Sequence, residues 1–236
     1  EYISDRQQQV LNTLYGVQAQ GDEFLPDGVT PNIVVVSTSA TVDTSSGLIV
    51  GENFKLTAPG DASKSADLAV TPVTTLLTSG DLSEADVAAA LGLEDVDNLL
   101  NYNPYEDTNS ARALKAEQTS HQVMNVLSTL QAAGETAGLT AEASLENSLK
   151  AFTEVIKVAT AANPINLTDA TADNAVGLDA LADSFVTLVE ADSSADAGKV
   201  ANLKTVTSDV LTGVSIVNER VEAAALVDGK LPTDLS

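Results

Sequence analysis

Residues 140–159 read TAEASLENSLKAFTEVIKVA, and this stretch gives the clearest indication of the protein's architecture. Its large apolar residues recur in alternating steps of four and three, at Leu145, Leu149, Phe152, Ile156 and Ala159. A repeat close to 3.6 residues places these side chains on one face of an α-helix. Thr140 stands before the repeat and is a favourable N-cap residue. A helix with one apolar face needs neighbours that cover this face.

Three further stretches repeat the rhythm on either side of this helix. The first is expected to run from 110 to either 134 or 138. The second should begin at 168 or 171, and the third should run from about 195 to 228. Their expected buried faces are Leu114, Val123, Val126, Leu127 and Leu130; Leu178, Leu181, Phe185 and Leu188; and Leu203, Val206, Val210, Val214, Val217 and Val221. Four long amphipathic helices joined by short loops favour an antiparallel up-and-down bundle.

The N-terminal third has a different pattern. A first helix is expected at 3–20, followed by an apolar β-branched strand at 33–36 and a looser strand at 48–56. Pro72 suits the first turn of a short helix. We therefore predict a mainly α fold, an antiparallel helical bundle with a small β-ribbon near the N-terminal third.

Two more residues mark the ends of another short helix. Ser83 is expected as its N-cap and Gly92 as its C-terminal residue.

We expect 1–236 to form a single domain in which 1–109, with the first helix, the ribbon and the short helices, packs on the long-helix bundle of 110–236.

Composition restricts the classes of partner. The chain has 34 acidic and 11 basic residues and a net charge of −23, which argues against binding to nucleic acid or to anionic membranes. It has no Cys, so neither disulfides nor thiol catalysis are available. No apolar run approaches the roughly 18 residues of a membrane span, so no membrane insertion is expected. Aromatic residues are 3% of the chain, which requires a core of small aliphatic side chains.

Catalytic patterns are scarce. His121 is the one histidine, with Glu117 and Met124 on the same side of its expected helix. A di-iron bundle needs two Glu-x-x-His elements, and a nucleophile elbow or phosphate loop does not occur. We therefore expect His121 to be a structural or surface residue, and we expect a protein that is not an enzyme.

Calcium is the one cofactor for which the sequence offers candidate ligands. Carboxylate and amide oxygens, which Ca²⁺ prefers, are dense after residue 94. The candidates are Asp95, Asp97, Asn101, Asn103 and Asp107. They do not follow the EF-hand spacing, because its internal glycine is missing. The alternative is that these residues form Asp/Asn turns that cap the following helices.

Three short motifs occur in a fixed order: LTAP at 56–59, VTPVTTLL at 70–77 and ALGL at 90–93. In this succession they resemble a module of large secreted bacterial adhesins of the RTX and cadherin-repeat type. The chain departs from that pattern at Val73, where the family usually has Leu, and at 37–41, where STSAT replaces a Gly-Gly-Thr-like turn. The resemblance implies a domain within, or cut from, a large extracellular calcium-associated protein, and it carries over no catalytic residues.

The motif residues themselves suggest an architectural role. Thr71, Thr74 and Thr75 can cap or back-bond the start of a helix while Leu76 and Leu77 are buried.

We expect a non-enzymatic structural or adhesive module of a large secreted or cell-surface bacterial protein, associated with calcium and able to self-assemble. Its expected partners are other domains or copies of the same secreted protein, and cell-surface components. The chain begins EYISD, without a signal peptide, so we expect a processed product or a piece of a longer protein. The alternative is an extracellular ligand- or glycan-binding domain, for which Tyr102 and Tyr105 are the first residues to test.

Overall fold

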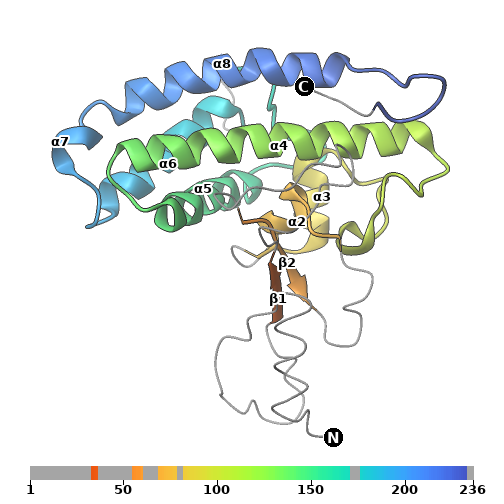
Figure 1. The fold of residues 1–236 in the computed structure, drawn as a ribbon, viewed down its shortest axis with the longest axis horizontal. Coiled ribbons are helices and arrows are strands. Elements are labelled where there is room, and N and C mark those ends of the chain that lie inside the picture. Colours follow the sequence, from red (N-terminus) through yellow and green to blue (C-terminus); the bar gives the residue numbers. More distant parts are fainter. Residues whose placement is uncertain (1–32, 37–54, 61–68, 79–81, 171–175, 233–236) are drawn as a thin grey trace, which may run out of the picture.

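The computed structural model describes residues 33–36, 55–60, 69–78, 82–170 and 176–232 (Figure 1). The helix predicted at 3–20 lies outside the described residues. The strand predicted at 48–56 also lies mostly outside them, and Lys55 and Leu56 are not part of a strand.

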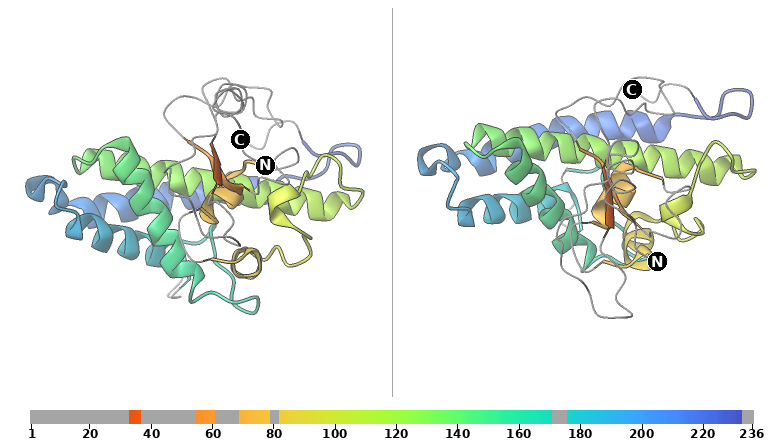
Figure 2. Two further views of the ribbon diagram at one scale, coloured as in Figure 1. Left: turned by 90° about the horizontal axis from the view of Figure 1, so that it is seen from below. Right: turned by 60° about the horizontal axis from the view of Figure 1, so that its bottom comes forward.

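Four long helices form the body of the molecule: α4 (Ser110–Thr136), α5 (Ala141–Ile156), α6 (Leu178–Ala191) and α8 (Leu203–Ala223). Each packs on the next, and α8 returns to pack on α4, so the four close into a bundle. Helices α4 and α8 lie side by side and antiparallel (Figure 1), whereas α5 crosses α4 obliquely (Figure 2). The predicted mainly α bundle is confirmed.

One of the predicted helix starts is wrong. Helix α6 begins at Leu178 rather than near Thr168 or Thr171. The side-chain oxygen of Asn166 accepts hydrogen bonds from the backbone N–H groups of Thr168 and Asp169, at 2.9 and 3.1 Å. This local turn competes with a helix for the same backbone groups.

The last predicted helix is divided near its start. A short helix, α7 (Ala197–Val200), precedes α8, and α8 ends at Ala223 rather than near 228.

Helix α5 has the predicted cap, because the Thr140 hydroxyl accepts the N–H of Ala143 at 3.2 Å.

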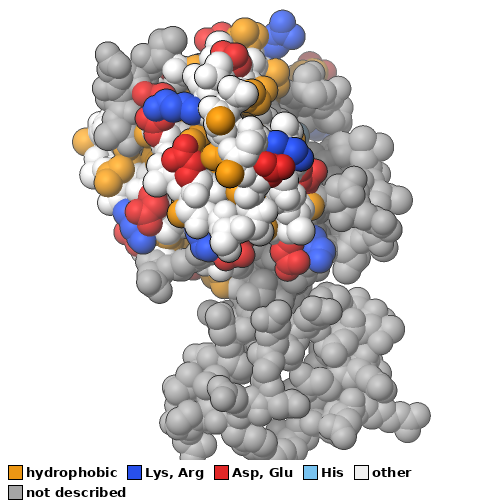
Figure 3. Space-filling view, turned by 90° about the vertical axis from the view of Figure 1, so that its left-hand side faces the viewer, with side chains coloured by type: hydrophobic (Ala, Val, Ile, Leu, Met, Phe, Trp, Pro, Cys, Tyr) orange, Lys and Arg blue, Asp and Glu red, His pale blue; other side chains and the backbone are white. Residues whose placement is uncertain are grey.

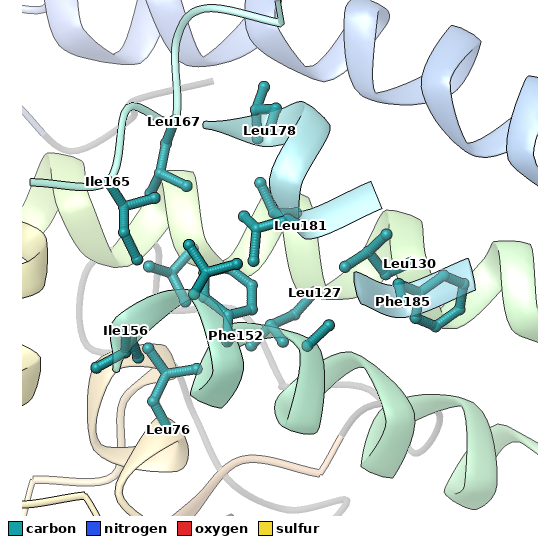
Figure 4. Packing of buried hydrophobic residues seen from close by; sticks show 14 of the residues in the cluster. Leu76, Leu127, Leu130, Phe152, Ile156, Ile165, Leu167, Leu178, Leu181 and Phe185 are labelled. Carbon is teal, nitrogen blue, oxygen red and sulfur yellow. The ribbon is translucent and has the colours of Figure 1, made fainter. Parts of the chain in front are cut away.

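The core between the helices is aliphatic apart from two phenylalanines. Phe152 of α5 and Phe185 of α6 are fully buried, and leucines from α4 and α6 surround them (Figure 4). The predicted faces of α4, α5 and α6 point inward. Five of their members are only partly buried, and the last of them lies beyond the end of α5: Leu114, Leu145, Leu149, Leu188 and Ala159. Small side chains let the helices approach closely, as close packing requires.

The predicted face of α8 is only half correct. Leu203, Val214 and Val221 are buried, but Val206, Val210 and Val217 point to solvent. The buried positions between them are instead Thr207, Leu211, Ser215 and Asn218. The physical reason lies on α4, which presents polar side chains to α8, as described below.

The β-ribbon consists of β1 (Ile33–Val36) and β2 (Thr57–Gly60), which pair antiparallel with Val35 opposite Ala58. The first predicted strand is therefore confirmed. Its partner strand follows residue 56, and the prediction at 48–56 placed that partner too early.

Three short elements connect the ribbon to the bundle: α2 (Pro72–Leu76), α3 (Glu84–Leu91) and the 3-10 turn η1 (Leu99–Asn101). Helix α2 packs on α4 and α5, and α3 packs on α5. The predicted Pro72 start, Ser83 cap and Gly92 end are all observed, and Gly92 has a φ of 65° that favours glycine. The described part of 1–109 thus packs on the helices that follow residue 110.

Two helical glycines give a matched test of this packing. A Cβ on Gly134 of α4 would lie 2.9 Å from Ser144 Cβ and 3.2 Å from Phe185 Cζ, whereas a Cβ on Gly213 of α8 meets nothing within 4 Å. Gly134→Ala should lower the free energy of unfolding by about 1–3 kcal/mol through overpacking. Gly213→Ala should raise it by up to about 1 kcal/mol through helix propensity. Urea unfolding followed by circular dichroism at low micromolar protein measures both, and changes of the same sign would contradict the packing described.

Candidate functional site

Three places in the described residues stand out, two for their hydrogen-bonded polar side chains and one for its exposed hydrophobic side chains. They are a threonine cluster at the start of α2, an acidic turn before α4, and the outer face of α8.

The threonine cluster fastens β2 to α2. The buried Thr75 hydroxyl accepts the backbone N–H of Thr57 at 2.9 Å and lies 3.0 Å from the Thr57 carbonyl oxygen and 2.8 Å from that of Thr71. The hydroxyls of Thr57 and Thr78 are 2.6 Å apart. These bonds join Thr57 of β2 to Thr75 of α2 and to Thr78 just after it, or close the helix start, so β2 and α2 form one hydrogen-bonded unit.

Thr71 and Thr74 complete the cluster as a reciprocal cap. The Thr71 hydroxyl accepts the N–H of Thr74 at 3.0 Å, and the Thr74 hydroxyl accepts the N–H of Thr71 at 2.8 Å. Leu76 and Leu77 are buried behind them. The predicted architectural roles of the three threonines and two leucines are confirmed.

The acidic turn is organised by Arg112, in the first turn of α4. Asp107 is nearly inaccessible, with 4% of its side chain exposed, and its two oxygens accept hydrogen bonds from Arg112 Nε at 2.6 Å and Nη2 at 2.8 Å. The Tyr102 hydroxyl donates to the same carboxylate at 2.5 Å, and the N–H of Asn109 donates at 2.8 Å. The hydrogen bonds from Arg112, and then those from Tyr102 and Asn109, hold the pKa of Asp107 well below its usual range.

The pKa values of the two side chains that bind Asp107 shift upward. Burial, and then the hydrogen bond to Asp107, raise the pKa of Tyr102 above its ordinary value. The pKa of Arg112 rises chiefly because it donates to Asp107. All three groups therefore keep their protonation states over the physiological range, and the turn is a fixed structural cross-link.

The structure brings two of the five predicted calcium ligands together, but around a guanidinium. Arg112 Nη1 donates to the backbone carbonyl of Asp95 at 3.3 Å, so Asp95 and Asp107 share Arg112. The side chain of Asn103 accepts the N–H of Tyr105 at 3.1 Å, as expected for an Asp/Asn turn. Asp97 is exposed and Asn101 lies in η1.

A calcium ion at these residues would thus compete with Arg112 for Asp107. Among the residues that the structure describes, no group of three or more His, Asp or Glu side chains is arranged to hold a metal ion. Calcium binding stays a prediction.

The two tyrosines of the alternative glycan site differ in exposure and in hydrogen-bond partner. The Tyr102 ring packs against the core and its hydroxyl binds Asp107, whereas 42% of Tyr105 is exposed and its hydroxyl donates to Glu117 at 2.9 Å. Tyr105 is therefore the more accessible of the two rings.

Helix α8 is held to α4 by a polar seam, formed by Gln118, Gln122 and Asn125 of α4 and Asn218 of α8. Gln122 Nε2 donates to the Asn218 carbonyl at 3.2 Å, and Asn125 Nδ2 donates to Asn218 Oδ1 at 2.9 Å. Asn218 is fully buried and donates its own amide to the carbonyl of Leu167 at 2.8 Å. Buried amides satisfied in this way fix the rotation of α8 about its axis, because turning the helix would leave them without partners.

Gln118 closes the seam at the C-terminal end of α8. Its Nε2 lies within 3.1 Å of the carbonyl oxygens of Val221, Glu222 and Ala224. The last carbonyls of a helix lack the usual donor four residues on. Val221 also accepts the N–H of Ala224 at 3.2 Å, and Gln118 supplies a donor from another helix.

The same rotation turns a valine stripe outward, which we define as Val206, Val210, Gly213 and Val217. Sequence reasoning missed this surface because it assigned these valines to the core. The signal that could have found it is the matching spacing of Gln118, Gln122 and Asn125 on α4, in steps of four and three, which identifies a polar rather than an apolar partner face.

Comparisons with known proteins add no relative to this description. The chain matches no family model, no curated protein and no solved structure at a significant level. Within the described part of the chain, no helix has both the length and the hydropathy of a membrane span.

The Asp107 cross-link predicts a pH-dependent stability. Because the folded protein depresses the pKa of Asp107, its contribution is present above the ordinary pKa of about 4 and is lost as pH falls toward the folded value. Asp107→Asn should therefore lower the free energy of unfolding by a constant amount from pH 5 to 8, and this difference from the wild type should shrink below about pH 4.

Asp97→Asn is the matched control, since Asp97 is exposed and its replacement should change stability by at most about 0.5 kcal/mol. Urea unfolding of the three proteins across this pH range measures the effect. A difference between wild type and Asp107→Asn that stays the same down to pH 2 would contradict the assigned role.

Proposed function

We propose that this chain is a non-enzymatic structural or adhesive module of a large secreted or cell-surface bacterial protein. The observation that carries the proposal is the use made of the three motifs that resemble those of secreted adhesins. Their apolar members Leu56, Ala58, Leu76 and Leu91 are buried, and their threonines fasten β2 to α2. Among these contacts, the bonds between Thr75 and Thr57 join β2 to α2, and α2 packs on the bundle.

The mechanism that this junction supports is transmission of position and load. A displacement of β2 reaches α2 through the Thr75 hydrogen bonds, and α2 passes it to α4 and α5 through buried side chains. A flexible linker would absorb the same displacement. A module that spaces or presents surfaces in a larger protein needs this kind of stiff connection.

The charge of the chain also supports an extracellular setting. A net charge of −23 keeps copies soluble and attracts cations, and its self-repulsion is weaker where salt or divalent ions are abundant. Calcium enters the proposal as an ion of that setting. Binding at Asp95, Asp97, Asn101, Asn103 and Asp107 would require Asp107 to exchange Arg112 for the ion.

Cell labelling tests the proposed location. An antibody raised against the folded bundle should label intact cells of the native source, or detect the protein in their medium, with a cytosolic protein as the negative control. Labelling that appears only after the cells are permeabilised would contradict the proposal.

The junction has its own test in Thr75→Val, which keeps the shape of the side chain and removes the hydroxyl. The Thr57 N–H then loses its acceptor, which should cost about 1–3 kcal/mol of stability and speed hydrogen exchange at that amide. Thr136→Val is the matched control, because Thr136 is exposed and only back-bonds within α4. Equal effects of the two substitutions would show that the Thr75 hydroxyl does not hold the junction.

A further inference from the structure

The outer face of α8 collects most of the exposed large hydrophobic side chains of the described residues. Val206 and Val210 are each 39% exposed, Ile216 is 51% exposed and Val217 is 43% exposed. Four of the seven such residues thus lie on one helix. Contiguous exposed apolar surface of this kind marks interaction sites more often than single exposed residues do.

The spacing of the valine stripe is that of a helix-pairing seam. Val206, Val210, Gly213 and Val217 follow each other in steps of four, three and four, which is the a/d repeat of helices that pack along their length. At Gly213 a methyl group would meet nothing within 4 Å. The middle of the stripe is therefore open to another helix at close range.

The charged residues beside the stripe indicate which kind of helix can pack on it. At 100° per residue, Asp209 and Arg220 are the charged residues of α8 that project beside the stripe, whereas Lys204 lies on the far side and binds Asp183 of α6 at 2.9 Å. Neither Asp209 nor Arg220 has an ion-pair partner among the described residues. The stripe is thus flanked by one acidic and one basic residue on a chain whose net charge is −23.

This arrangement is self-complementary. When two α8 helices pair antiparallel about a two-fold axis between residues 214 and 215, Asp209 of each copy faces Arg220 of the other. Val217 of each copy then lies within one residue of the level of Gly213 of the other, so a large side chain packs beside the open position. A two-fold interface presents the same patch on both copies, as this requires.

We propose that a second copy of this chain docks on the valine stripe, with the two α8 helices antiparallel. One helix pair makes a small interface, and the two chains repel each other through their net charge, so the dimer is weak and forms more readily as salt rises. The inference rests on the proposed structural role, because it supplies that role with a partner. A monomeric protein would overturn the inference and leave the cell-labelling result unchanged.

Sedimentation equilibrium of the full chain from about 10 µM to 1 mM, at low and high salt, is the first test. The wild type should shift from monomer toward dimer with concentration, and further in high salt. Val217→Glu should weaken the dimer by at least about tenfold, because it buries a charge in the seam. Val158→Glu is the matched control, since it adds the same charge at a residue 58% exposed outside α8, and it should associate within about threefold of the wild type.

A charge exchange tests the antiparallel geometry. Asp209→Arg and Arg220→Asp should each weaken association by about tenfold, because each places like charges opposite one another. The double variant should recover to within about threefold of the wild type. Asp209→Arg is the sharper single change, because it lowers the net negative charge of the chain and would strengthen association if only overall repulsion mattered.

Circular dichroism and melting of each variant check that the exposed substitutions leave the fold intact. A wild type that stays monomeric to 1 mM in high salt would overturn the proposal, as would equal weakening by Val158→Glu and Val217→Glu. A double variant that associates no better than the single ones would overturn the antiparallel pairing.

Discussion

The rest of the structure depends on the burial of one aliphatic face of α4. Val123, Val126, Leu127 and Leu130 are fully buried, and α4 is the helix on which α2, α5 and α8 all pack. Burying four such side chains contributes roughly 1.5–3 kcal/mol each, before the entropy of ordering them is counted. With few aromatic side chains to fill space, the helices must come close, and Gly134 lets α4 approach Ser144 and Phe185. The shape of the bundle follows from that closeness.

Different elements pack on opposite sides of α4. The threonine cluster, α2 and β2 lie below α4 in Figure 1, and α8 with its valine stripe lies above it. The junction of β2 with α2 thus lies on one side of α4, and the exposed valines of α8 lie on the other. At the end of the bundle near α7, acidic and basic side chains alternate with hydrophobic ones (Figure 3). That end of the molecule therefore differs from the outer face of α8, where exposed valines gather.

The sequence predicted those features that depend on local chemistry. The caps at Thr71, Ser83 and Thr140 were predictable because a side-chain oxygen before a helix satisfies free N–H groups within three residues. The apolar faces of α4, α5 and α6 were predictable because each follows the helical repeat. The threonine cluster was anticipated only at the helix start, since the bonds to Thr57 join residues far apart in the sequence.

The rotation of α8 could not be read from its own residues. Apolar residues recur at helical spacing on both sides of α8, with Val206, Val210 and Val217 exposed and Leu211, Val214 and Val221 buried, so hydrophobicity alone does not select the buried face. The choice is made by Asn218, which must meet Gln122, Asn125 and the carbonyl of Leu167. The partner of Asp107 could not be predicted for a similar reason: in the sequence Asp107 lies among potential calcium ligands, and only the fold brings Arg112 to its carboxylate.

Because the chain has no cysteine, thiol labelling can measure the rotation of α8 directly. Val217→Cys and Val221→Cys lie one helical turn apart, and the structure exposes the first residue and buries the second. In dilute solution the thiol at 217 should react with a disulfide reagent at nearly the rate of a free thiol. The thiol at 221 should react at least about a hundredfold more slowly. A thiol at 221 that reacts as fast as the one at 217 would mean that α8 is turned differently, and that the valine stripe is not the surface of this protein.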